Sequence, residues 1–203
     1  MRCKRRMKHS KKPLLLNNLP IPMKYTPFKI LSSERIINEP FCKIEKQRVE
    51  FPDKTEGDWF VHLSNNAVIV MPLLDNGNIL LQNNYKHGGG KVVTEFCAGI
   101  IDDGETSIQA AARELFEETG YQAKSFKVLG KTLANPTASA MEYFFVVAEG
   151  CEPGTERELE PAEQIETFEV ASLDEVESHL LQGDYISSSA SVAALSFLKS
   201  YLK

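Results

Sequence analysis

The segment 99–121, GIIDDGETSIQAAARELFEETGY, constrains the fold of this chain more than any other part of the sequence. Thr106 followed by Gln109 is a capping-box pattern, which predicts a helix that begins near Ser107. Gly120 is placed to end this helix. Four apolar positions of the helix share one face, which we expect to pack on a sheet: Ile108, Ala111, Ala112 and Leu115.

The same helix concentrates negative charge. Glu114 and Glu118, at positions i and i+4, share a face that differs from the apolar one, with Glu117 beside them. Like charges at this spacing destabilise an isolated helix, and Arg113 neutralises only part of the repulsion. A solvated acidic face is the simpler interpretation, but such a face does not require the fixed spacing of glycines, glutamates and arginine found here. Mg²⁺ prefers oxygen ligands and keeps several waters, so we expect a magnesium platform.

The composition sets broad limits on the protein. With 203 residues, 42% of them hydrophobic and 25% charged, the chain has the profile of one soluble globular domain. A net charge of -5 gives no indication of nucleic-acid binding by the body of the protein, and it favours cationic cofactors such as metal ions. The four cysteines form no CxxC pair and follow no secretory signal, which predicts reduced thiols in a cytoplasmic protein. No apolar run approaches the ~20 residues of a membrane helix, so we expect no membrane partner.

Strands and turns dominate from Lys29 onward. The apolar run 67–73 is followed by Asp75-Asn76-Gly77 and by Ile79-Leu80-Leu81, which predicts a hairpin of two buried strands. The patterns in 142–150 and 165–172 predict two further strands. Helices are expected in LDEVESHLLQGD, closed by Gly183, and in the amphipathic C-terminal ASVAALSFLKSYL. The sum predicts an α/β (α+β) sandwich, in which a mixed β-sheet packs between helices.

The segment 99–121 resembles the Nudix box, G-x5-E-x7-R-E-U-x-E-E-x-G-U, in which U is an aliphatic residue. The matching residues are Gly99, Glu105, Arg113, Glu114, Leu115, Glu117, Glu118 and Gly120. Tyr121 departs from the pattern at the last position, which usually packs in the core. The resemblance implies the Nudix sandwich fold and the hydrolysis of a nucleoside diphosphate linked to another moiety.

The resemblance also implies the roles of individual residues. Arg113 and Glu105 would form an ion pair that orients the helix. Water would be the nucleophile, and bound Mg²⁺, or Mn²⁺ in its place, would neutralise the charge that develops on the phosphorus. The implied metal ligands are Glu114 and Glu118, with Glu117 as a further ligand directly or through water, and the backbone carbonyl of Ala98.

The residues ahead of the box are similar to those of ADP-ribose and nucleotide-sugar pyrophosphatases. Tyr85-Lys86 stands where that group has tyrosine-arginine, and EFCAG at 95–99 stands where it has ELPAG. Pro136 and the C-terminal segment 165–198 also resemble this group. We therefore expect Lys86 and Glu95 to bind substrate, although lysine lacks the bidentate fork of arginine.

The general base and the nucleobase contact are less defined by the sequence. The loop NPTASAMEYFF contains Glu142, which is either the base or a strand residue with its carboxylate in solvent. Glu160 and Glu163 are the competitors. Trp59 would either stack on a nucleobase or lie in a core or an interface.

The expected function is Mg²⁺-dependent cleavage of ADP-ribose or a related nucleoside diphosphate sugar to a nucleoside monophosphate and a sugar phosphate. The alternatives are another diphosphate substrate, such as GDP-mannose, a dinucleotide or a nucleoside triphosphate, and a non-catalytic sensor that binds nucleotide sugars. We divide the chain into a basic flexible tail (1–28), an N-terminal strand region (29–62) and a Nudix hydrolase domain (63–203). The resemblance implies a homodimer formed through the N-terminal strands.

Overall fold

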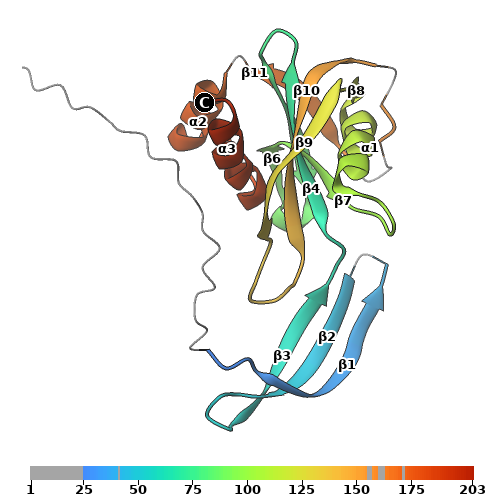
Figure 1. Ribbon diagram of the computed structural model, residues 1–203, viewed down its shortest axis with the longest axis vertical. Coiled ribbons are helices and arrows are strands. Elements are labelled where there is room, and N and C mark those ends of the chain that lie inside the picture. Colours follow the sequence, from blue (N-terminus) through green and yellow to red (C-terminus); the bar gives the residue numbers. More distant parts are fainter. Residues whose placement is uncertain (1–24, 41, 155–156, 160–162, 171) are drawn as a thin grey trace, which may run out of the picture.

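The computed structural model describes residues 25–40, 42–154, 157–159, 163–170 and 172–203. Most of the predicted basic tail and Glu160 lie outside the described residues. The rest of the chain forms a three-stranded N-terminal sheet and a larger eight-stranded sheet that is flanked by helices (Figure 1).

The larger sheet is mixed, as the sequence predicts. Its order is β11-β5-β4-β10-β8, with β6 paired to β5, β7 to β4 and β9 to β10. Strands β10 and β4 run parallel, whereas the other pairs are antiparallel. The strands are β4 (Ala67–Leu74), β5 (Ile79–Lys86), β6 (Lys91–Glu95), β7 (Cys97–Ile100), β8 (Tyr121–Gln122), β9 (Ser125–Leu133), β10 (Glu142–Pro153) and β11 (Ile165–Val170).

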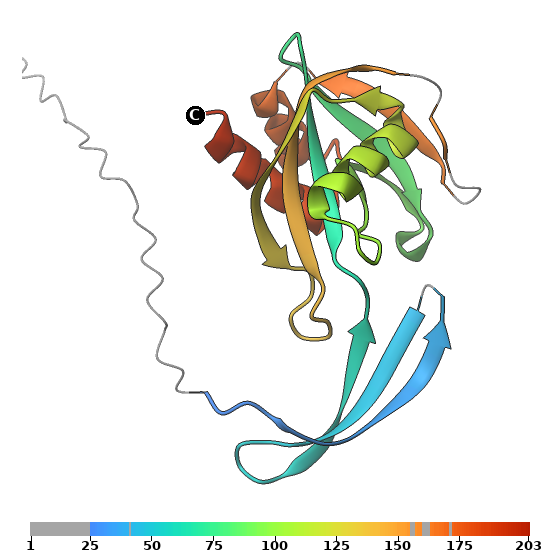
Figure 2. The same ribbon diagram turned by 45° about the vertical axis from the view of Figure 1, so that its right-hand side comes forward.

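Helices cover both faces of this sheet. Helix α1 (Ser107–Thr119) lies on one face, and α2 (Leu173–Gln182) and α3 (Ser189–Tyr201) lie on the other (Figures 1 and 2). Neighbouring residues of β10 therefore enter different cores: Phe145 packs with Leu198 of α3, and Val146 packs with Leu115 of α1. The α+β sandwich is confirmed. None of the described helices has the length and hydropathy to cross a membrane.

The predicted signals at the ends of α1 are confirmed. Thr106 and Gln109 form the capping box, and Gly120 ends the helix with φ 74 while its N–H donates to the Phe116 carbonyl oxygen at 2.7 Å. A left-handed backbone at this position favours glycine.

The prediction for the apolar face of α1 is wrong at one position. Ala112 is exposed, whereas Ala110 is fully buried. The buried face is rotated toward the acidic side of the helix, because Glu114 and Glu118 also lie under the neighbouring strand and are 9% and 3% exposed. The carboxylates therefore belong to the packed face of the helix.

The N-terminal sheet is attached to the larger one by few contacts. It contains the antiparallel strands β1 (Lys29–Glu39), β2 (Cys42–Glu50) and β3 (Glu56–Leu63). The His62 N–H donates to the Ala138 carbonyl oxygen at 2.7 Å, and the Trp59 indole N–H donates to the Thr137 carbonyl oxygen at 3.0 Å. Strand β1 is exposed along its whole length. The sheet is thus joined to the larger one by the short segment 64–66 and by these bonds to the loop between β9 and β10, which lies beside β3 in Figure 2.

The rotated face of α1 predicts different costs for one substitution at two alanines. Ala110→Leu should destabilise the fold by about 1–3 kcal/mol, because it overpacks a filled core. The matched control Ala112→Leu should change the free energy of unfolding by less than about 0.5 kcal/mol, because the side chain enters solvent. Urea denaturation measures both values. Equal costs at the two positions would contradict the assigned face.

Candidate active site

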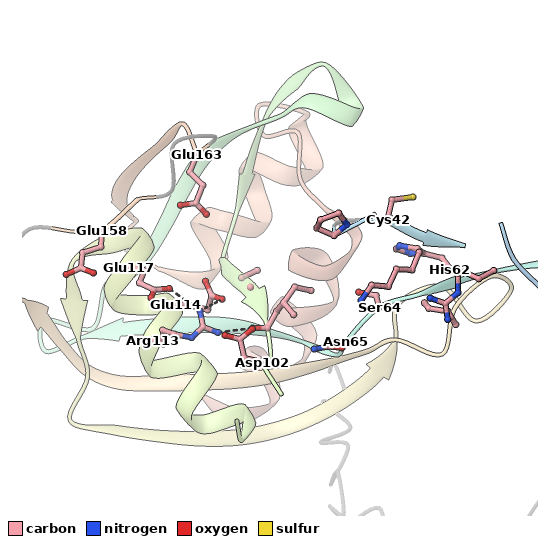
Figure 3. Close-up of a pocket in the computed structure, with 17 residues that line it drawn as sticks. Cys42, His62, Ser64, Asn65, Asp102, Arg113, Glu114, Glu117, Glu158 and Glu163 are labelled. Carbon is pink, nitrogen blue, oxygen red and sulfur yellow. Dashed lines mark hydrogen bonds and ion pairs between the residues drawn. The ribbon is translucent and has the colours of Figure 1, made fainter. Parts of the chain in front are cut away.

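A cleft of ≈ 830 Å³ separates helix α1 and strand β7 from the N-terminal sheet (Figure 3). One wall is acidic, and the other presents the basic side chains Arg35 and Lys43 together with the His62 imidazole. The acidic side is formed by Glu114 and Glu117 of α1 together with Glu158 and Glu163 from the chain ahead of β11, and Ala98, Gly99 and Arg113 also line the cleft. A molecule in this cleft would therefore meet charges of both signs.

Gly99 allows the acidic helix to approach the sheet. The Glu114 carboxyl group occupies the space that a Cβ atom on Gly99 would fill. Any side chain at this position would push Glu114 away from β7. The first glycine of the box is therefore a packing requirement of the site.

Arg113 joins four groups at the base of the acidic wall. Its Nε and Nη2 donate to the two carboxylate oxygens of Glu105, both at 3.0 Å. Its Nη2 also donates to the Ile100 carbonyl oxygen at 2.8 Å. Its Nη1 donates to Glu114 Oε1 at 2.7 Å and to Glu117 Oε2 at 3.0 Å. The planar guanidinium thus ties the loop before α1 to two carboxylates on the helix.

Glu118 is fixed from the sheet side. Its Oε2 accepts a hydrogen bond from the backbone N–H of Ala98 at 3.0 Å and another from the Gln82 amide at 3.0 Å. Two donors on one oxygen restrict the rotation of the carboxylate.

Two opposing effects set the pKa values of these carboxyl groups: burial raises them, and hydrogen bonds from donors lower them. Burial raises the pKa of Glu114 to about 7, although Arg113 opposes the shift. Burial also raises the pKa of Glu118, against the hydrogen bonds from Cys97, Gln82 and Ala98. The hydrogen bond with Arg113 lowers the pKa of Glu105. Two carboxylates that burial drives toward the neutral form are the ones that an added cation would stabilise most.

The donor set suits a hard divalent cation, because it consists of carboxylate and carbonyl oxygens. No three His, Cys, Asp or Glu side chains in the described parts of the chain already surround a common point as metal ligands would. Glu114 and Glu117 are turned to Arg113, and Glu118 is turned to Gln82.

The two expected substrate-binding residues contact each other. Lys86 Nζ lies 2.7 Å from Glu95 Oε1, and the Asn84 amide lies 3.4 Å from the same oxygen. Neither Lys86 nor Glu95 lines the cleft. Glu95 is 5% exposed, so a substrate would have to displace Lys86 to reach it.

The structure separates the candidates for the general base. Glu142, at the start of β10, pairs with Lys131 at 2.8 Å and does not line the cleft. Glu163 lines the cleft, and its side chain extends toward the Glu114 and Glu117 side (Figure 3). Trp59 also lies outside the cleft lining, where it contacts Phe28 edge-on with ring centroids 5.6 Å apart.

Sequence reasoning missed several residues around the site. Gln82 and Asn84 alternate along β5 with the predicted Lys86, and this period of two could have placed both on the same face, toward α1. The basic wall had no comparable signal, since Arg35, Lys43 and His62 come from three different strands.

Comparisons with known proteins show which family and relatives this chain resembles. Residues 63–191 match the NUDIX domain. The chain is 28% identical to "ADP-ribose pyrophosphatase" of Bacillus subtilis over 75% of this chain and 83% of that protein. It is 28% identical to "ADP compounds hydrolase NudE" of Escherichia coli over 86% of this chain and 92% of that protein. A crystal structure of an ADP compounds hydrolase superposes with a TM-score of 0.75 at 25% identity, covering 88% of this chain and 95% of that one.

The chain belongs to the NUDIX family, because the family match covers more than half of it and includes the whole box. It is a Nudix pyrophosphatase, a hydrolase that acts on diphosphate bonds.

The several bonds of the half-buried Arg113 predict that lysine cannot replace its guanidinium. Arg113→Lys should lower the free energy of unfolding by about 2 kcal/mol, because one ammonium cannot serve Glu105, Glu114 and the Ile100 carbonyl together. The matched control is Arg48→Lys, where the arginine bonds Glu56 and Asp58 at the surface. That control should cost less than about 1 kcal/mol. Guanidinium denaturation that gives equal losses would contradict the structural role of Arg113.

Proposed function

We propose that this protein hydrolyses ADP-ribose or a related nucleoside diphosphate sugar, giving a nucleoside monophosphate and a sugar phosphate, with Mg²⁺ as its cofactor. The observation that carries the proposal is the acidic wall of the cleft, where Glu114 and Glu117 line the space beside Ala98 and Gly99. Glu118 is buried directly behind this wall and accepts the Ala98 N–H. The names of the relatives in Bacillus subtilis and Escherichia coli support an ADP-containing substrate.

Glu114, Glu117, Glu118 and the Ala98 carbonyl are the residues that would hold the cation. When bound, Mg²⁺ would neutralise charge on the diphosphate and make a water molecule easier to deprotonate. Glu114 and Glu117 would exchange their hydrogen bonds with Arg113 for this role, while Arg113 keeps its two bonds to Glu105. The fork thus continues to hold the helix when the carboxylates turn.

The opposite wall suits an anionic substrate. Arg35, Lys43 and His62 face the acidic helix across the cleft, so a diphosphate between the walls would be attracted from both sides once a cation is bound. Lys86 would be a second contact for phosphate if it leaves Glu95. The sugar and the base would then extend along the cleft.

Glu163 is the general base that we propose. It comes from the chain before β11 and points to the carboxylate wall (Figure 3). Its carboxylate would accept the proton of the attacking water, and the new P–O bond would form as the bridging P–O bond of the diphosphate breaks. Glu142 would have to leave Lys131 to do the same.

Two further expectations remain part of this proposal. The exposed strand β1 would pair with a second copy to form a homodimer, since its free edge and apolar side chains, including Ile30 and Ile37, are open to solvent.

The buried Cys97 and Cys151 are free thiols, in keeping with a reducing cytoplasm.

Substrate and cofactor are tested together by a panel assay. Phosphate release through a coupled phosphatase should occur with ADP-ribose and nucleoside diphosphate sugars in the presence of Mg²⁺, and stop on addition of chelator. Glu118→Gln should remove most of the turnover while ligand binding persists, because it takes one negative charge from the cation's ligand set. Turnover confined to triphosphates or dinucleotides would refute the substrate. No turnover by the wild type would favour a nucleotide-sugar sensor.

Glu163 and Glu142, the two candidate bases within the described residues, give opposite predictions. Glu163→Gln should lower kcat by about 100- to 10,000-fold with little change in KM, because it removes proton transfer and keeps the shape of the side chain. Glu142→Gln is the matched control and should change kcat by only a few-fold, because it breaks a surface pair with Lys131. Steady-state kinetics at saturating Mg²⁺ decides between them. A large loss confined to Glu142→Gln would reverse the assignment.

A further inference from the structure

Gln82 is a polar side chain at a buried position of β5, where an apolar residue would be expected. It is 1% exposed, and it follows the buried apolar run Ile79, Leu80 and Leu81 of β5. Its carbonyl oxygen Oε1 is buried and has no hydrogen-bond partner within the described residues. An unpaired buried carbonyl costs free energy, which a leucine at this position would avoid. The amide therefore serves something other than stability.

The contact that the amide does make is with the acidic helix. Its Nε2 donates to Glu118 Oε2 at 3.0 Å, the same oxygen that accepts the Ala98 N–H at 3.0 Å. The Ala98 donor comes from β7 and the Gln82 donor from β5, so the oxygen is held by two strands. The carboxylate also accepts a hydrogen bond from the Cys97 thiol, and its remaining lone pairs are available to a cation.

The Ala98 N–H and the Cys97 thiol both come from β7, so without Gln82 the carboxylate could pivot about this one strand. The Gln82 donor removes this freedom, because the bonds from both strands must break before Oε2 can turn into the cleft. Hydrogen bonds of this kind from residues behind a ligand orient it and strengthen its binding of the metal.

We propose that Gln82 is a positioning residue that holds Glu118 in the orientation needed to bind a divalent cation. The inference rests on the proposed function, because it takes Glu118 as a metal ligand. Gln82 acts through Glu118 and contacts neither substrate nor cation. The unpaired carbonyl is the cost of placing the amide N–H on this carboxylate.

The test is Gln82→Met, which keeps the length of the side chain and removes the donor. Mn²⁺ serves as the probe, and its binding to the metal-free full-length protein is followed by the electron paramagnetic resonance signal of free Mn²⁺. We expect the Kd for Mn²⁺ to rise by about 10-fold. The thermal midpoint of the metal-free protein should stay the same or rise, and saturating metal should restore kcat.

Two controls separate positioning from a purely structural role. Ser191 is another buried polar residue, 5% exposed, and its hydroxyl accepts the Phe96 N–H at 3.0 Å on the other side of the sheet. Ser191→Ala should lower the thermal midpoint and leave the Kd for Mn²⁺ unchanged. Adding Gln82→Met to Glu118→Gln should not weaken Mn²⁺ binding further, because the amide acts through that carboxylate.

The outcomes distinguish this inference from the proposed function. If Glu118→Gln loses Mn²⁺ and Gln82→Met binds it like the wild type, the positioning role is wrong and the metal site stands. If Glu118→Gln binds Mn²⁺ as tightly as the wild type, the metal site is wrong and the role of Gln82 is overturned with it.

Discussion

The active-site wall depends on the burial of carboxylates from α1 against the backbone of β7. Moving a charged group out of water costs free energy. Here hydrogen bonds from specific donors offset that cost: the Arg113 guanidinium bonds Glu114, and the Ala98 N–H bonds Glu118. The helix can lie this close because Gly99 has no side chain. Capping by Thr106 and termination at Gly120 fix the register that brings both glutamates to the strand.

The site is assembled from parts with different tolerance to change. Arg113 bonds Glu105 and the Ile100 carbonyl through Nε and Nη2, so the loop before α1 is anchored by contacts separate from those to Glu114 and Glu117. Glu114 and Glu117 bond the same nitrogen, Nη1, which leaves them the more replaceable contacts. The network can therefore give up two carboxylates without releasing the helix.

The sequence predicted the parts of the fold that follow from local patterns. The capping box at Thr106, the hairpin around Gly77 and the stop at Gly183 are each encoded within a few residues, and the structure confirms them. The face of α1 was misjudged at Ala112, because burial of the glutamates is a tertiary effect that hydrophobicity alone does not register. Glu142 pairs with Lys131 of the adjacent strand β9, and Glu163 enters the cleft, because of how strands and loops pack in three dimensions. No local sequence pattern encodes this packing.

Because the N-terminal sheet is attached by few contacts, the residues that would bind substrate and those that would cleave it lie in two separate parts of the structure. The residues that would hold the cation belong to α1 and β7, and the proposed base Glu163 lies ahead of β11. The basic wall belongs to β1, β2 and β3, and within the described residues it joins the rest through the short segment 64–66 and two hydrogen bonds to the loop before β10. The distance between the walls can thus change through the attachment alone. In this architecture the breadth of accepted substrates and the rate of bond cleavage are free to evolve along separate paths.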